Sequence, residues 1–171
     1  MNIRKELLHA KRQTKELAMA VATFAISEAD NFRELMDCFL SNDYRLAQRA
    51  AWCVSRAVRD QPSMITPHLN TLVKQLDKTG VHPAVIRNTV RILKAIEIPE
   101  AFHGQVMNAC FRLIESPSTP AAIKAFSLTI LFNLAKIYTE IKEELKLIIN
   151  SVYETETPAF KARARKILPY L

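Results

Sequence analysis

The sequence predicts an all-α protein: a right-handed α-solenoid, or superhelix, of about four helical hairpins with an N-terminal capping helix. Only two glycines, Gly80 and Gly104, occur in 171 residues. This is too few for a sheet of tight hairpins, which need residues that tolerate positive φ. Eight prolines punctuate the chain, and apolar residues recur at helical spacing between them. A pattern that recurs every 37 to 39 residues is typical of stacked helix pairs.

Residues 1–30 are expected to cap the stack, either as one long helix or as a broken pair over residues 2–28. Basic residues precede an apolar run, 17–26, in the manner of a signal peptide. Glu6 and Glu16 interrupt the basic part, however, and the run is far shorter than the ~20 residues that cross a bilayer. We therefore expect a soluble, cytoplasmic protein without a membrane partner.

The rest of the single domain, 1–171, divides into four repeats of two helices each. We place the repeats at 31–62, 63–99, 100–138 and 139–171. Their first helices are predicted over 31–41, 63–78, 100–116 and 140–154, and their second helices over 44–59, 83–97, 120–136 and 158–168. Asn42 or Asp43, Thr119 and Thr157 stand where they would cap the first, third and fourth of these second helices.

The sequences of the four second helices can be aligned with one another. In each, a polar residue follows the first apolar anchor, and these polar residues are separated by 39, 37 and 37 positions: Gln48, Arg87, Lys124 and Lys161. Each such unit has an apolar face that one helix pair cannot bury alone, so the units must stack.

One repeat carries a recognisable pattern. Leucines at 69, 72 and 76 are followed by a short turn and by Val85-Ile86-Arg87-x-x-Val90-x-x-Leu93. This resembles the HEAT-repeat and armadillo-like α-solenoid family over residues 31–171. The family often carries an Asp late in the first helix and an Arg early in the second, and Asp77 and Arg87 resemble that pair. The other repeats have Gln48, Lys124 and Lys161 in place of the Arg.

Basic residues concentrate on the second helices, where only Glu97 opposes them. The resemblance implies that second helices line the inner, concave surface, which would make that surface positive. Residues spaced by four and seven positions share one helical face, and this places the only tryptophan among arginines. The expected partner contacts are Arg45, Arg49, Trp52, Arg56, Arg87, Arg91, Lys94 and Lys124.

Three interpretations of this face remain open. In the first, the cations form only a solvated face, and their stems cover apolar neighbours. In the second, the face holds an acidic protein or peptide, as a non-catalytic binding or scaffold module would. In the third, it binds nucleic-acid phosphates, and the pI of about 9.5 is compatible with this alternative.

An enzymatic version of the last alternative resembles the HEAT-like DNA alkylation-repair glycosylases. That resemblance implies several aromatics and a carboxylate in the groove, whereas Trp52 stands alone, so we expect no enzyme. The four histidines lack metal-ligand spacing, no phosphate-binding glycine loop occurs, and we expect neither a metal, a cofactor nor a small-molecule substrate. The three cysteines lie in apolar helical patterns, as buried, reduced thiols do.

Overall fold

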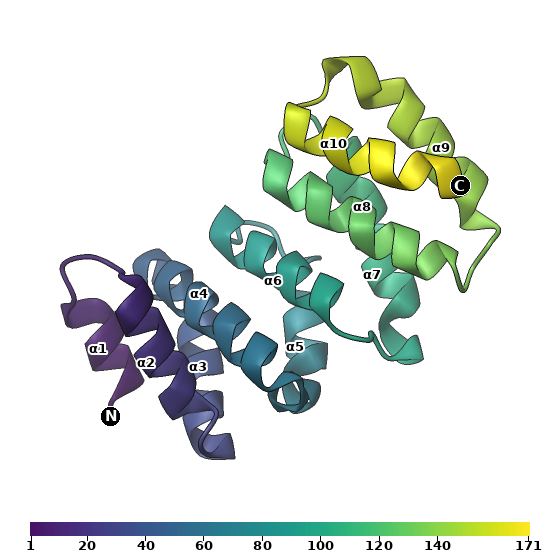
Figure 1. Cartoon of the computed structure of the whole chain (residues 1–171). Coiled ribbons are helices and arrows are strands. Elements are labelled where there is room, and N and C mark those ends of the chain that lie inside the picture. The colour runs from purple at the N-terminus through teal and green to yellow at the C-terminus, as the bar shows by residue number, and fades with distance from the viewer. The chain divides into compact units, whose positions relative to one another are not determined.

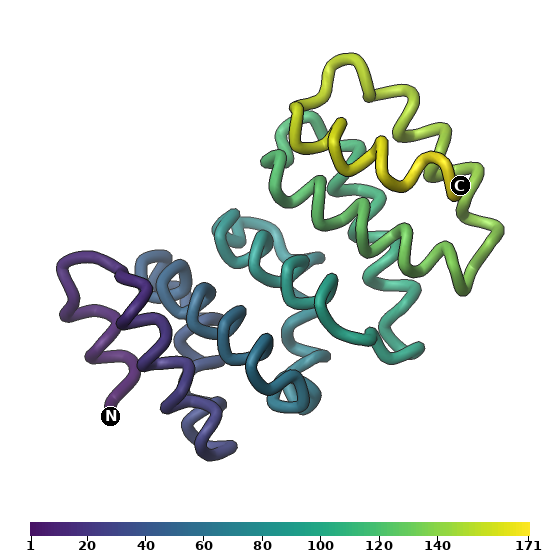
Figure 2. Tube along the Cα trace, in the orientation of Figure 1, coloured from purple at the N-terminus to yellow at the C-terminus, as the bar shows by residue number.

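The computed structural model describes all residues, Met1–Leu171, and every regular element in it is a helix. The chain folds into two compact units, Met1–Ile96 and Glu97–Leu171. Within each unit, consecutive helices turn back on one another as hairpins (Figure 2). The prediction of an all-α fold of stacked helix pairs is therefore confirmed.

The first unit holds three hairpins (Figure 1). They are α1 (Ile3–His9) with α2 (Lys15–Ala25), α3 (Ala29–Phe39) with α4 (Tyr44–Asp60), and a final pair. In that final pair a 3-10 helix, η1 (Pro62–His68), leads into α5 (Leu69–Lys74), and α6 (Pro83–Ala95) follows. Residues 2–28 thus form two helices joined by a turn, so the broken pair is the correct one of the two alternatives for this segment.

Helix α4 is the centre of the first unit, because α1, α2, α3 and α6 all pack against it. Its buried face is rich in alanine, including Ala47, Ala50, Ala51 and Ala57. Small side chains let several helix backbones approach one helix closely, at the usual interaxial distance of ~8–10 Å. The opposite face of α4 is left to polar and charged residues.

Side-chain caps fix where the helices begin. The Asp43 carboxylate accepts hydrogen bonds from the amides of Arg45 and Leu46, at 3.0 and 3.1 Å, and the Thr157 hydroxyl accepts one from Phe160 at 3.3 Å. These two caps agree with the sequence. The predicted cap at Thr119 is wrong, because Pro120 occupies the capping position and no side chain bonds to the free amides there.

The second unit is built around α8 (Ala121–Ala135), which packs against α7 (His103–Glu115), α9 (Ile141–Val152) and α10 (Pro158–Ile167). Short 3-10 turns, η2 (Glu100–Phe102), η3 (Tyr153–Thr155) and η4 (Leu168–Tyr170), flank these helices. Helix α8 is covered on nearly every side, since Asn133 is its only exposed residue. None of the ten α-helices combines the length and hydrophobicity needed to span a bilayer.

All three cysteines are buried and unpaired. Burial raises the pKa of Cys38 to about 11 and the pKa values of Cys53 and Cys110 to about 12. Because only the thiolate is nucleophilic, we expect a disulfide reagent such as DTNB to leave the native protein unlabelled at pH 8 and to label three thiols in urea. Fast labelling of any thiol without urea would contradict this burial.

The same shifts predict how stability changes with pH. As pH rises above 9, the unfolded chain loses its thiol protons, while the folded chain retains that of Cys38 up to about pH 11 and those of Cys53 and Cys110 up to about pH 12. Stability that is fully present below pH 9 therefore falls between pH 9 and about 12, which urea denaturation at several pH values would measure. The Cys110→Ala variant should show a shallower fall over that range than the unsubstituted chain.

Candidate functional site

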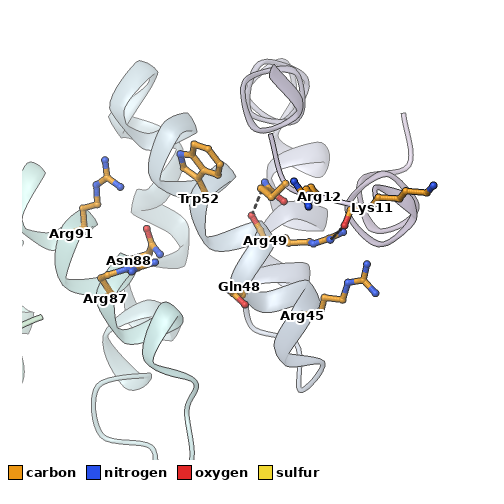
Figure 3. A pocket seen from close by; sticks show the side chains of 10 residues that line it. Lys11, Arg12, Arg45, Gln48, Arg49, Trp52, Arg87, Asn88 and Arg91 are labelled. Carbon is orange, nitrogen blue, oxygen red and sulfur yellow. Dashed lines mark hydrogen bonds between the residues drawn. The ribbon is translucent and has the colours of Figure 1, made fainter. Parts of the chain in front are cut away.

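A cavity of about 550 Å³ opens in the first unit between the α1–α2 turn, α4 and α6 (Figure 3). Its volume lies within the range of about 300–1,000 Å³ that is usual for ligand sites. Three separate segments of the chain form its wall. We call it the basic cavity; it is lined by Lys11, Arg12, Gln13, Arg45, Gln48, Arg49, Trp52, Arg87, Asn88 and Arg91.

The lining contains six cationic side chains and no carboxylate. Five of these cations, Lys11, Arg12, Arg45, Arg87 and Arg91, form no salt bridge and no side-chain hydrogen bond within the protein. All five are exposed. Like charges held together without counter-charges repel one another and favour the arrival of an anion.

Arg49 is the exception among the six, because its guanidinium is used to hold the wall together. It donates hydrogen bonds to the carbonyl oxygens of Leu7, of Ala10 at 2.7 Å and of Lys11 at 3.3 Å. These carbonyls belong to the end of α1 and the turn after it. Burial, and then repulsion from Arg45, lower the pKa of Arg49. Arg49 therefore fixes the turn against α4.

Gln13 completes this attachment from the other side. Its side-chain amide donates to the backbone oxygen of Arg49 at 3.3 Å and to the Cys53 sulfur at 3.5 Å. Thr14 next to it caps α2 by accepting the amide hydrogen of Leu17 at 3.1 Å. The turn is thereby held at both ends, and it presents Lys11 and Arg12 to the basic cavity.

Trp52 forms the one aromatic part of the wall. Trp52 is 38% exposed, although large aromatic residues are usually more deeply buried. Arg45, Gln48, Arg49 and Trp52 lie at positions i, i+3, i+4 and i+7 of α4, and therefore on one face. Across the cavity, α6 contributes Arg87, Asn88 and Arg91 (Figure 3).

Five of the residues expected from the sequence thus line one cavity: Arg45, Arg49, Trp52, Arg87 and Arg91. Arg56 and Lys94 do not line it. Arg56 forms a salt bridge of 2.8 Å with Asp60, one turn further along the same helix. The structure extends α4 to Asp60 and ends α6 at Ala95, so Asp60, and not Glu97, is the acidic residue among the basic ones on α4 and α6.

Lys124 requires a correction. It is only 3% exposed, and its ammonium forms a salt bridge with Glu156, whose side chain is 10% exposed. A buried lysine already paired with a carboxylate cannot contact a partner. The remaining half-exposed positions of α8 include Ala122, Ala125, Thr129 and Phe132, so this second helix presents an apolar face and the expectation of a basic one is wrong.

Five lining residues were not among the expected contacts: Lys11, Arg12, Gln13, Gln48 and Asn88. For the first three, a signal exists in retrospect, because Thr14 is a good helix cap directly after a basic run. Asn88 is buried on α6, where its amide donates to the Ala84 carbonyl at 2.8 Å. Nothing in the helical pattern distinguishes it from an ordinary core position.

The histidines, cysteines and carboxylates nowhere gather in groups of three that could ligate a metal ion. The sequence profile of the HEAT repeat domain matches residues 3–171. Searches among curated proteins and among solved structures found no match to this chain.

Proposed function

Because the chain belongs to the HEAT repeat domain family, we propose that it is a non-catalytic, cytoplasmic binding module whose basic cavity holds an acidic segment of a partner protein. HEAT repeats commonly mediate protein interactions and serve as scaffolds. Three unpaired cysteines support a reducing compartment. The observation that carries the proposal is the set of five unpaired cations around one cavity that has no carboxylate.

The composition of the wall also suits a protein partner. Tryptophan and arginine are the residue types most enriched among those that dominate binding energy at protein interfaces. Trp52 offers apolar area at the side of the cavity, while Arg45, Arg87 and Arg91 offer planar donors that match carboxylates in a bidentate manner. An acidic segment would satisfy both parts of the wall.

A charge-reversal pair tests this function. The chain is used to capture proteins from a native lysate. We expect the Arg87→Glu, Arg91→Glu double variant to capture the acidic partner proteins in amounts about tenfold or more lower than the unsubstituted chain, because the reversed charges repel the anionic segment. Quantitative mass spectrometry of the captured proteins measures the loss.

The matched control is Lys5→Glu, Arg59→Glu, which makes the same change of net charge on exposed residues of the first unit outside the cavity. Glu at position 5 in the first turn of α1 is favourable to the helix dipole, and Glu at position 59 in the last turn of α4 is unfavourable, so the two effects offset each other. Equal losses in both double variants would mean that net charge, and not the cavity, retains the partners.

Nucleic acid is the second candidate, and Trp52 is the observation that favours it, because a base can stack on an exposed indole beside arginines. Titration of duplex and single-stranded DNA at several salt concentrations separates the two. Phosphate contacts with duplex DNA give a log–log salt slope of about −0.9 for each phosphate contacted. A protein-binding module shows no binding of either DNA at physiological salt.

A further inference from the structure

We infer that the basic cavity is a phosphate-binding site and that the acidic segment it holds carries a phosphorylated serine or threonine. This inference rests on the proposed function and adds the chemistry of the recognised group. Cations from three segments, the α1–α2 turn, α4 and α6, surround one cavity instead of lying along one helix.

The number of cations favours a dianion over a carboxylate. An Asp or Glu side chain brings one negative charge and two acceptor oxygens, and so balances only one of the five unpaired cations. A phosphorylated serine brings a charge of about −1.5 to −2 and three acceptor oxygens. Arginine forks bind such oxygens in pairs, and Arg45, Arg87 and Arg91 approach from two helices.

The construction of the wall supports a dedicated site. Arg49 and Gln13 use their hydrogen bonds to hold a non-helical turn in place, and that turn adds Lys11 and Arg12 to a region that is already positive. This arrangement increases repulsion in the empty protein. An anion that bridges the turn, α4 and α6 would relieve the repulsion, so binding of phosphate should also stabilise the first unit.

In the first unit the unpaired cations gather around one cavity, and in the second unit α10 carries exposed cations while α8 carries none. On α8 the equivalent lysine, Lys124, is buried against Glu156, and the half-exposed positions are mainly apolar. Successive phosphates of a nucleic acid need cations along a path. A single phosphorylated side chain needs them at one point, as they occur here.

The test compares three pools of fluorescein-labelled peptides. All peptides have acidic residues at both ends and mixed residues in the middle, and the pools differ only at the central position, which is phosphoserine, serine or glutamate. Fluorescence anisotropy with the full chain should show at least tenfold tighter binding of the phosphoserine pool than of the serine pool, and clearly weaker binding of the glutamate pool. Inorganic phosphate should compete with the phosphoserine pool. Because Trp52 is the only tryptophan, its emission should change on binding of the unlabelled phosphoserine pool.

Variants connect the result to the cavity. Arg87→Ala, Arg91→Ala should lose at least tenfold in affinity for the phosphoserine pool, whereas Lys5→Ala, Arg59→Ala should not, with thermal unfolding confirming that both variants fold. Equal binding of the phosphoserine and glutamate pools would overturn the phosphate inference and leave the acidic-partner proposal standing. A single-stranded oligonucleotide that binds more tightly than the phosphoserine pool, with affinity rising with its length, would overturn both.

Discussion

The Lys124→Met variant is expected to have a free energy of unfolding about 3–5 kcal/mol lower than that of the unsubstituted chain. Removal of the ammonium leaves the Glu156 carboxylate, which is 10% exposed, without its partner. An unpaired charge in that position must be hydrated by opening the structure or must take up a proton. The pair also joins α8 to the turn before α10, 32 residues away. Urea denaturation followed by circular dichroism measures the loss.

Two further variants show whether the pair is the cause. Lys124→Met, Glu156→Leu removes both charges and should recover at least half of the loss, because well-packed apolar residues replace buried ion pairs without large cost. Lys146→Met, at an exposed position of α9, should change the free energy of unfolding by no more than about 0.5 kcal/mol. A loss below 1 kcal/mol for Lys124→Met would show that water reaches Glu156 freely.

The second large effect is expected at Arg49. The Arg49→Ala variant should lose about 2–3 kcal/mol, because hydrogen bonds to a charged group contribute about 1.5–3 kcal/mol and the guanidinium holds three carbonyls of α1 and its turn. The turn should open first, since it is held mainly from α4. Trypsin should then cleave after Lys11 and Arg12 at least tenfold faster than in the unsubstituted chain.

Arg45→Ala is the matched control for this experiment. It lies one turn earlier on α4, lines the same cavity and makes no side-chain hydrogen bond, so its loss should stay within about 0.5 kcal/mol. Arg49→Lys should recover only part of the stability, because one ammonium cannot reproduce the two-armed geometry of the guanidinium. Similar trypsin rates for Arg49→Ala and the unsubstituted chain would show that the turn is held by other contacts.

Local information was sufficient for much of the fold. The helical recurrence of apolar residues and the caps at Asp43 and Thr157 place α4 and α10 within two residues of their predicted bounds. The same spacing places Arg45, Trp52, Arg87 and Arg91 on exposed faces, and these four residues do line one cavity. The spacing of apolar residues indicates which side of a single helix is buried, and the bounds of these helices and the exposure of these four residues depend mainly on that.

Features that depend on distant packing could not be predicted. Whether Lys124 faces solvent depends on Glu156, which belongs to a turn placed by the packing of α10 on α8. The contribution of Lys11 and Arg12 depends on Arg49, 38 residues after Lys11. No regular spacing connects such residues, because their contact results from how the turns dock and not from the repeat.

The attachment of the α1–α2 turn by Arg49 also has a consequence for biosynthesis. The turn leaves the ribosome well before residue 49 does, and until then its carbonyls lack the Arg49 guanidinium as a donor. The basic cavity is therefore completed late, after α4 has emerged and folded back on α1 and α2. A nascent chain presents Lys11 and Arg12 without the rest of the cavity wall, so the proposed binding of an acidic segment requires a folded first unit.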